Sequence, residues 1–176
     1  HEIGHTLGLL HNMAASAAIP VDSLRSPSFT AVHGTTASIM DYARFNYVAQ
    51  PEDKDVRLVP PSLGEYDRYA IEWLYKPVPG AKDMWEEAAM AEALIDRHEG
   101  DPYYRYGPQQ PAMSPVQYDP TARTQDLGDD AVRAGDYGVA NLKYILAQMQ
   151  QWIEDDADYA HRRELYKQLC AQYGRY

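Results

Sequence analysis

The spacing of three histidines near residue 1 constrains the fold more than any other feature of this chain. Residues 1–11 read HEIGHTLGLLH, so His1, His5 and His11 stand in the pattern HExxHxxGxxH. Residues four apart lie on one face of a helix, which lets His1 and His5 direct their imidazoles at one ion. Gly8 can take the left-handed conformation that ends a helix and turns the chain back toward His11. The spacing therefore predicts a zinc site with three protein ligands.

Three protein ligands leave a fourth position open to water, which is typical of catalytic rather than structural zinc. Glu2 follows the first ligand directly, and a carboxylate there can act first as general base and then as general acid. The simple alternative is a solvated surface glutamate, because HExxH alone also occurs on ordinary helices. That alternative fits poorly for a residue between two predicted ligands. We therefore expect Glu2 to be catalytic.

A second element lies some thirty residues downstream, where residues 38–42 read SIMDY. With the histidine pattern, it resembles the zinc motif and Met-turn of the metzincin metallopeptidases. The resemblance implies that Met40 is a packing floor beneath the imidazoles and not a ligand. It also aligns Tyr42 with the astacin tyrosine that can bind zinc and swing to the oxyanion. A core tyrosine that packs beside the turn is the open alternative for Tyr42.

Three further blocks look like the bacterial Met-zincin family, whose large zinc-dependent metalloproteases carry the motif in their C-terminal half. These blocks are MDYARFNY at residues 40–47, YDRYAI at residues 66–71 and DLGDD at residues 126–130. The resemblance implies a peptidase that acts on a peptide or protein substrate outside the cytoplasm, in the periplasm, in the cell envelope or secreted. Asn12 stands where astacins have Glu and matrixins have Ser, so neither specificity carries over.

The resemblance implies a zincin-like α+β catalytic domain in residues 1–78, of which this is the lower, C-terminal part. Residues 79–176 are then a helical extension packed on it. A chain that begins on a zinc ligand is expected to be a fragment, with a sheet upstream in the same parent chain as its partner. Two alternatives stay open, a zinc hydrolase of non-peptide amides and a non-catalytic, metal-containing binding module. An intact Glu2 argues against the binding module, because a structural site has no use for a base.

Composition limits the partners. The chain has 176 residues and a net charge of −10, so neither nucleic acid nor an anionic membrane surface would attract it. Its most apolar stretch, residues 3–21, is interrupted by polar residues and Pro20, and we expect no membrane segment. Cys170 is the only cysteine, which excludes a disulfide within the chain.

Hydrophobic periodicity predicts a mainly α chain. Helices are expected at residues 1–10, 62–75, 84–97, 130–153 and 158–173, and residues 13–37, 51–61 and 101–124 are expected to be mostly loop. In the first helix Ile3, Leu7 and Leu10 are available for a core. Ser62 and Glu65 are predicted to form a capping box at the start of the second.

Several other polar residues have a structural and a functional interpretation. Asp126, Asp129 and Asp130 suggest either a calcium site or a capped helix start. We favour capping, because no Asp-x-Asp-x-Asp-Gly loop is present. His33 lies where metzincins build the wall of the S1′ pocket, although a plain loop histidine is the simpler interpretation. Two further histidines, His98 and His161, are expected at the surface.

Overall fold

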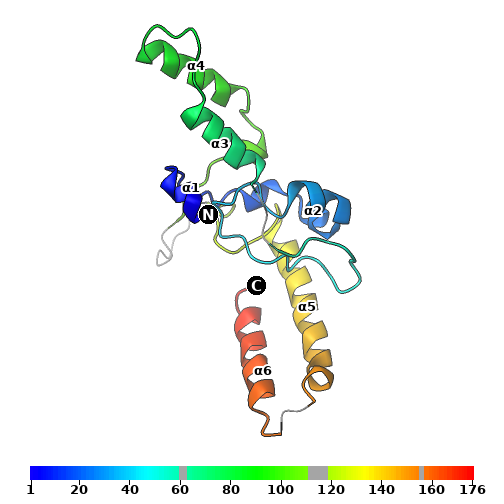
Figure 1. Ribbon diagram of the computed structural model, residues 1–176. Helices are drawn as coiled ribbons and strands as arrows, with labels where there is room; N and C mark the ends of the chain where they lie inside the picture. Colours follow the sequence, from blue (N-terminus) through cyan, green and yellow to red (C-terminus); the bar gives the residue numbers. More distant parts are fainter. Residues whose placement is uncertain (60–62, 111–118, 155–156) are drawn as a thin grey trace.

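The computed structural model describes residues 1–59, 63–110, 119–154 and 157–176, and within these ranges the protein is helical without a strand (Figure 1). This confirms the mainly α prediction, whereas the α+β zincin fold stays a prediction. The α-helices are α1 (Glu2–Thr6), α2 (Pro27–His33), α3 (Glu65–Tyr75), α4 (Met84–Asp96), α5 (Ala131–Trp152) and α6 (Ala160–Tyr173). The 3₁₀ helices are η1 (Ser16–Ala18), η2 (Val21–Arg25) and η3 (Pro102–Tyr104).

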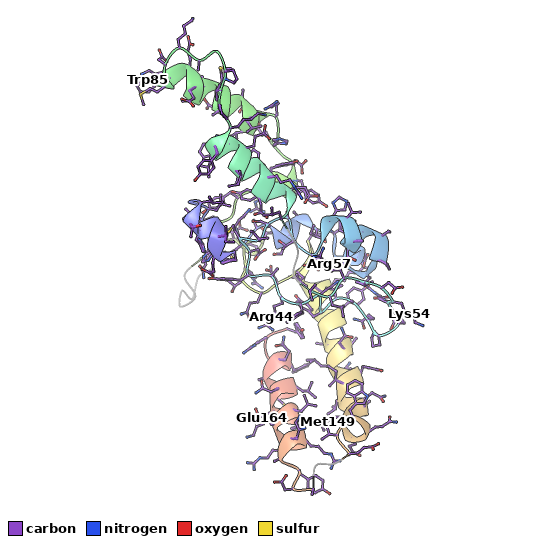
Figure 2. All side chains as sticks on the ribbon, in the orientation of Figure 1. Arg44, Lys54, Arg57, Trp85, Met149 and Glu164 are labelled. Carbon is purple, nitrogen blue, oxygen red and sulfur yellow. The ribbon has the colours of Figure 1, made fainter. Side chains whose placement is uncertain are left out.

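The molecule is elongated, with a central body of short helices and long loops between two helical arms (Figure 1). Helices α3 and α4 form one arm, and the exposed Trp85 stands at its outer end (Figure 2). Helices α5 and α6 pack as a hairpin in the other arm. The chain then returns to the central body, where the ring of Tyr176 lies 4.9 Å from that of Tyr47.

The largest core lies in the central body and joins segments that are distant in the sequence. Ile19, Leu24 and Val48 are fully buried, and they pack with Leu127 and Ala134 from the start of α5 and the loop before it. The predicted extension therefore shares a core with the segment that carries the histidines. The two-domain division itself stays a prediction.

The three later helices confirm the periodicity, because α4, α5 and α6 end within two residues of the predicted positions. The capping prediction is confirmed for Asp130, whose carboxylate accepts a hydrogen bond from the backbone N–H of Arg133 at 2.9 Å. Asp129 makes a different contact. Its carboxylate accepts from the backbone N–H of Val21 at 2.8 Å and ties the start of α5 to η2.

The predicted length of the first helix is wrong. Helix α1 ends at Thr6, because Gly8 takes a φ of +85° and turns the chain. The residues predicted for a core are exposed, with Leu10 at 68% as an example. Leu9 is buried instead. The helical spacing did not predict the burial of Leu9 and Leu10, because both residues follow the turn at Gly8 and are not part of the helix.

The prediction that residues 13–37 are mostly loop is also wrong, because η1, η2 and α2 together cover more than half of this segment. Ser26 caps the helix by accepting a hydrogen bond from the backbone N–H of Phe29 at 3.3 Å. Pro27 occupies the first helical position, where its missing N–H costs nothing. Ser-Pro at residues 26–27 was a readable start signal.

The predicted capping box of α3 is wrong as well. Gly64 is the N-cap, and its backbone N–H donates to the carboxylate of Asp67 at 2.8 Å. Glu65 does not reach back, since its carboxylate lies 3.0 Å from Nδ1 of His33. Ser62 lies outside the described residues.

Candidate metal centre

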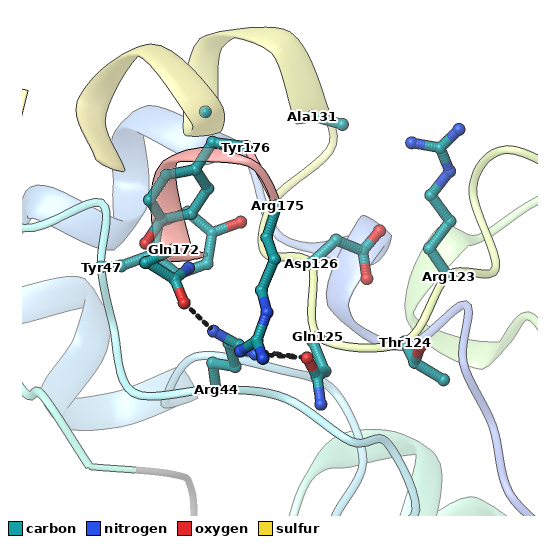
Figure 3. A pocket seen from close by; sticks show the side chains of 11 residues that line it. Arg44, Tyr47, Arg123, Thr124, Gln125, Asp126, Ala131, Gln172, Arg175 and Tyr176 are labelled. Atoms are coloured by element: carbon teal, nitrogen blue, oxygen red, sulfur yellow. Dashed lines mark hydrogen bonds between the residues drawn. The ribbon is translucent and has the colours of Figure 1, made fainter. Parts of the chain in front are cut away.

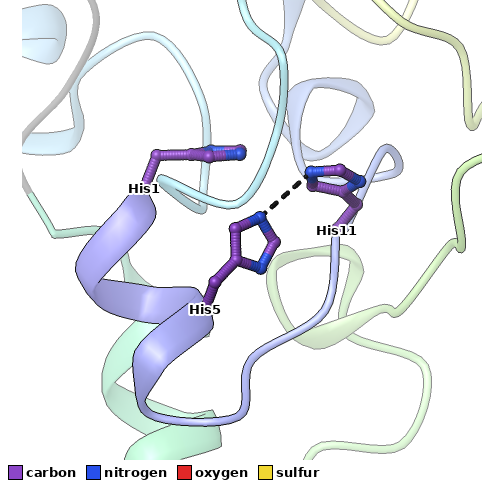
Figure 4. Close-up of side chains that lie close together, drawn as sticks. All are labelled: His1, His5 and His11. Atoms are coloured by element: carbon purple, nitrogen blue, oxygen red, sulfur yellow. Dashed lines mark hydrogen bonds between the residues drawn. The ribbon is translucent and has the colours of Figure 1, made fainter.

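Three imidazoles converge in the central body (Figure 4). His1 immediately precedes α1, His5 lies within it, and His11 returns after the turn at Gly8. One ring nitrogen of each histidine lies within 4.8 Å of the other two. In the described part of the chain this is the one group of three His, Cys, Asp or Glu side chains close enough to share a metal ion.

The second nitrogen of each ring, Nδ1, faces an oxygen that can only accept a hydrogen bond. In its neutral form each ring therefore carries its proton on Nδ1, which leaves a lone pair on Nε2. Outer contacts of this kind fix the tautomer and orientation of metal-binding histidines. The three pairs are His1 with the carbonyl of Ile39 at 2.7 Å, His5 with the carbonyl of Leu9 at 2.9 Å, and His11 with Oε1 of Gln109 at 2.6 Å.

The remaining nitrogens face one another across a small gap, and one of their separations matches tetrahedral zinc. The Nε2 atoms of His5 and His11 lie 3.2 Å apart, and Nε2 of His1 is buried without a hydrogen-bond partner. This contact is a hydrogen bond if one of the two Nε2 atoms carries a proton (Figure 4). If both are deprotonated, their lone pairs face each other, and a cation between them removes the repulsion. With Zn–N bonds of roughly 2.0–2.1 Å, tetrahedral geometry separates two ligand nitrogens by about 3.3 Å. The donor set therefore suits Zn²⁺ and leaves a fourth position open.

Met40 lies in a turn and is fully buried. It packs against Leu9 and Ala70, and its sulfur lies against Gly4 in α1. A Cβ at Gly4 would lie 2.4 Å from Sδ of Met40, so this helix position has no room for a side chain. Met40 thus supports the helix that contains His5 and follows directly on His1.

Asp67 of α3 holds the turn in place. It is buried, and its carboxylate accepts from Oγ of Ser38 at 2.6 Å and from the backbone N–H of Ile39 at 2.9 Å. The carbonyl of Ile39 is in turn the partner of Nδ1 of His1. Helix α3 thereby helps to orient His1 through the backbone of Ile39.

The structure places the ring of Tyr42 against the histidines, whereas Glu2 adjoins them in the sequence. Glu2 is exposed in the first turn of α1, directly after His1. The ring of Tyr42 stacks on His1 at a centroid distance of 5.1 Å and lies 4.6 Å from the ring of His11. Tyr42 is 42% exposed, so its ring forms a rim of the site that solvent reaches.

Two residues of this site were missed by the sequence interpretation. Gln109 reaches His11 from the predicted loop, and no local pattern marks it. Asn12 is fully buried, and its side chain accepts from the N–H of Gly107 at 2.9 Å and donates to the carbonyl of Arg105 at 3.0 Å. Its position next to the third ligand was the only available signal.

The other histidines lie away from the three imidazoles. His33 ends α2, pairs with Glu65, and stacks on Phe29 with 4.6 Å between the ring centroids. His98 is half-buried, and its ring stacks on Tyr104 with a centroid separation of 3.8 Å. His161 is exposed, as predicted.

One buried and one half-buried carboxylate, Asp41 and Asp126, lie close together. Burial, with a smaller contribution from the charge of Asp126, raises the pKa of Asp41 to about 7. Burial also raises the pKa of Asp126 to about 6. Ser16 bridges the pair, because its backbone N–H donates to Asp41 at 2.8 Å and its hydroxyl donates to Asp126 at 3.3 Å. Oδ1 of Asp41 is buried without a hydrogen-bond partner.

A cavity of about 470 Å³ lies beside the ends of α5 and α6 (Figure 3). Arg44, Arg123 and Arg175 contribute to its lining, and Arg44 donates to the side-chain oxygens of Gln125 and Gln172. None of the three converging histidines lines it. This cavity is therefore separate from the candidate metal centre.

Comparison with known proteins gives one match. A family model described as Met-zincin matches residues 1–176, which is the full length of the chain. No curated protein and no solved structure matches it. Of the helices in the described ranges, none combines the length and apolarity that crossing a membrane requires.

Proposed function

Because the chain belongs to the Met-zincin family, we propose that it is a zinc metallopeptidase that hydrolyses peptide bonds. Family membership suggests metallopeptidase chemistry in general. The observation that carries the finer proposal is the shared orientation of His1, His5 and His11. An oxygen holds each Nδ1, so three Nε2 atoms are free to bind Zn²⁺.

A zinc ion held by these residues would supply Lewis acidity, which polarises a carbonyl and lowers the pKa of water toward about 7. Glu2 is exposed, so both water and a peptide can reach its carboxylate. In our proposal Glu2 takes one proton from the water that attacks the carbonyl carbon. It then donates that proton to the amine that leaves when the C–N bond breaks.

Tyr42 has a separate role in this proposal. Its stacking on His1 and His11 leaves the ring partly exposed at the edge of the site. From there the phenol can donate a hydrogen bond to the oxygen that becomes negative when the carbonyl is attacked. Met40 takes no part in proton transfer and supports α1 from below.

Two substitutions in the intact protein test the proposal. His5→Ala should lose bound zinc, measured by elemental analysis. Glu2→Gln should retain zinc but lose hydrolysis of a mixed peptide library by roughly 10²–10⁴-fold, because only the proton carrier is removed. Glu92→Gln, an exposed position on α4, is the matched control. Normal turnover in Glu2→Gln would assign the base to another residue, and normal zinc in His5→Ala would refute the ligand assignment.

The family resemblance also supports a location outside the cytoplasm, which we propose on that basis alone. Fractionation of cells that express the intact protein tests the proposal. We expect the protein in the periplasm, the envelope or the medium. Recovery with the cytoplasmic fraction alone would contradict it.

A further inference from the structure

The third histidine is anchored differently from the other two. Nδ1 of His1 and of His5 bond to backbone carbonyls, which any residue could supply. Nδ1 of His11 bonds to a side chain, the amide oxygen of Gln109, at 2.6 Å. The two residues are 98 positions apart, so this contact exists only if the segment that carries Gln109 docks beside the histidines.

The segment is fixed on the side that precedes Gln109. Asn12 binds the backbone at Arg105 and Gly107, and the N–H of Met13 donates to the carbonyl of Gly107 at 2.7 Å. The approach is close, since a Cβ at Gly107 would lie 2.6 Å from Cβ of Ala14. The residues directly after His11 thus hold the chain that leads to its partner.

The segment is also fixed on the other side. Gln110 is buried, and its amide nitrogen donates to the carbonyl of Ala122 at 3.0 Å. Its amide oxygen accepts from the N–H of Asp119 at 3.2 Å. Gln109 therefore stands between two anchored neighbours, Gly107 and Gln110, although its own side chain is at the surface. Metal binding therefore does not have to pay the entropy of ordering the backbone at Gln109, because its neighbours are already held.

We propose that Gln109 is a positioning residue of the metal centre, which makes the loop of the helical extension part of the zinc site. The amide oxygen holds the proton on Nδ1 of His11 and sets the angle of the ring, so that Nε2 points at the metal. This inference rests on the proposed zinc site. Loss of such an outer contact typically weakens metal binding by about 10–100-fold, and the exposure of Gln109 favours the lower end.

Zinc affinity of the intact protein, measured by competition with a chelator, tests the inference without an activity assay. Gln109→Leu keeps the size but lacks an acceptor, and we expect about 10-fold weaker binding. Gln109→Glu keeps an acceptor and should bind zinc at least as tightly as the wild type. Gln151→Leu, an exposed position on α5, is the matched control and should bind zinc like the wild type.

The melting temperatures of the metal-free proteins separate positioning from stability, and we expect all four to agree. If Gln109→Leu melts lower, Gln109→Asn replaces it, since its amide is polar but one methylene too short to reach His11. If Gln109→Leu binds zinc with wild-type affinity, the inference about Gln109 is overturned but the proposed zinc site is not. Equal weakening in Gln109→Leu and Gln109→Glu would also overturn it, because packing would then explain the effect. A wild type that binds no zinc would refute the proposed function itself.

Discussion

Replacing Asp41 by Asn should stabilise the protein at neutral to alkaline pH. Asp41 is only 6% exposed, and its ionised form lies near a second carboxylate, that of Asp126. One oxygen accepts a hydrogen bond from the N–H of Ser16, and the other has no partner. Asn keeps an acceptor for Ser16 and carries no charge. The amide N–H₂ of Asn takes the place of Oδ1, the oxygen that has no hydrogen-bond partner. The repulsion between the Asp41 and Asp126 carboxylates is then absent.

The size of the effect follows from the pKa. Burial raises the pKa of Asp41 from 3.8 to about 7. Each unit corresponds to about 1.4 kcal/mol, so full ionisation costs the folded state about 4 kcal/mol. Because the folded state binds more protons than the unfolded state, the stability from a protonated Asp41 is complete below about pH 4 and is lost as pH rises through 7. The advantage of Asp41→Asn should grow over the same window, with about 4 kcal/mol as its upper limit.

Urea denaturation of both proteins at several pH values between 4 and 9, with a chelator present, measures this difference. The chelator removes the separate pH dependence of metal binding. Asp136→Asn makes the same chemical change at an exposed position of α5 and is the matched control. A difference between wild type and Asp41→Asn that is constant with pH would show that Asp41 does not titrate as its burial implies.

Three further predictions concern the histidine helix and its rim. Gly4→Ala places a Cβ 2.4 Å from the Met40 sulfur. It should lower the free energy of unfolding by about 1–3 kcal/mol, and with it the melting temperature, and it should weaken zinc binding. An unchanged melting curve would contradict the close contact. Met40→Leu roughly conserves volume and should cost less than about 1.5 kcal/mol while zinc content stays normal, whereas loss of zinc would make Met40 a ligand. Tyr42→Phe should lower kcat by roughly 10–1000-fold without loss of zinc or stability. Unchanged kcat with a lower melting temperature would give Tyr42 a packing role alone.

The convergence of the histidines could be predicted because it is local. His1 and His5 are one helical turn apart, and the glycine turn returns His11 to them within a few residues. Local geometry of this kind follows from residue spacing and the conformational freedom of Gly8. The long helices α5 and α6 were predictable for the same reason, since their periodic patterns extend over several turns.

The contacts that orient the histidines could not be predicted, because they depend on how distant segments pack. No sequence pattern distinguishes Gln109, and it reaches His11 only because Asn12 binds the loop that contains it. Asp67 looks like an ordinary residue of a helix start, yet it binds the turn that holds His1. The burial that raises the pKa of Asp41 arises from tertiary packing as well. Spacing identifies the ligands, whereas their orientation is a property of the folded chain.

The three oxygens that orient the imidazoles belong to segments around residues 9, 39 and 109. A metal ion with high affinity only for the assembled site therefore favours the state in which these segments are docked together. Its contribution to folding is RT ln(1 + [Zn²⁺]/Kd), about 4 kcal/mol when free zinc exceeds Kd a thousandfold. The free energy of unfolding thus depends on the free zinc concentration, and it falls where the metal is scarce. Melting temperatures recorded at a series of buffered free zinc concentrations would therefore report the zinc affinity of the folded protein.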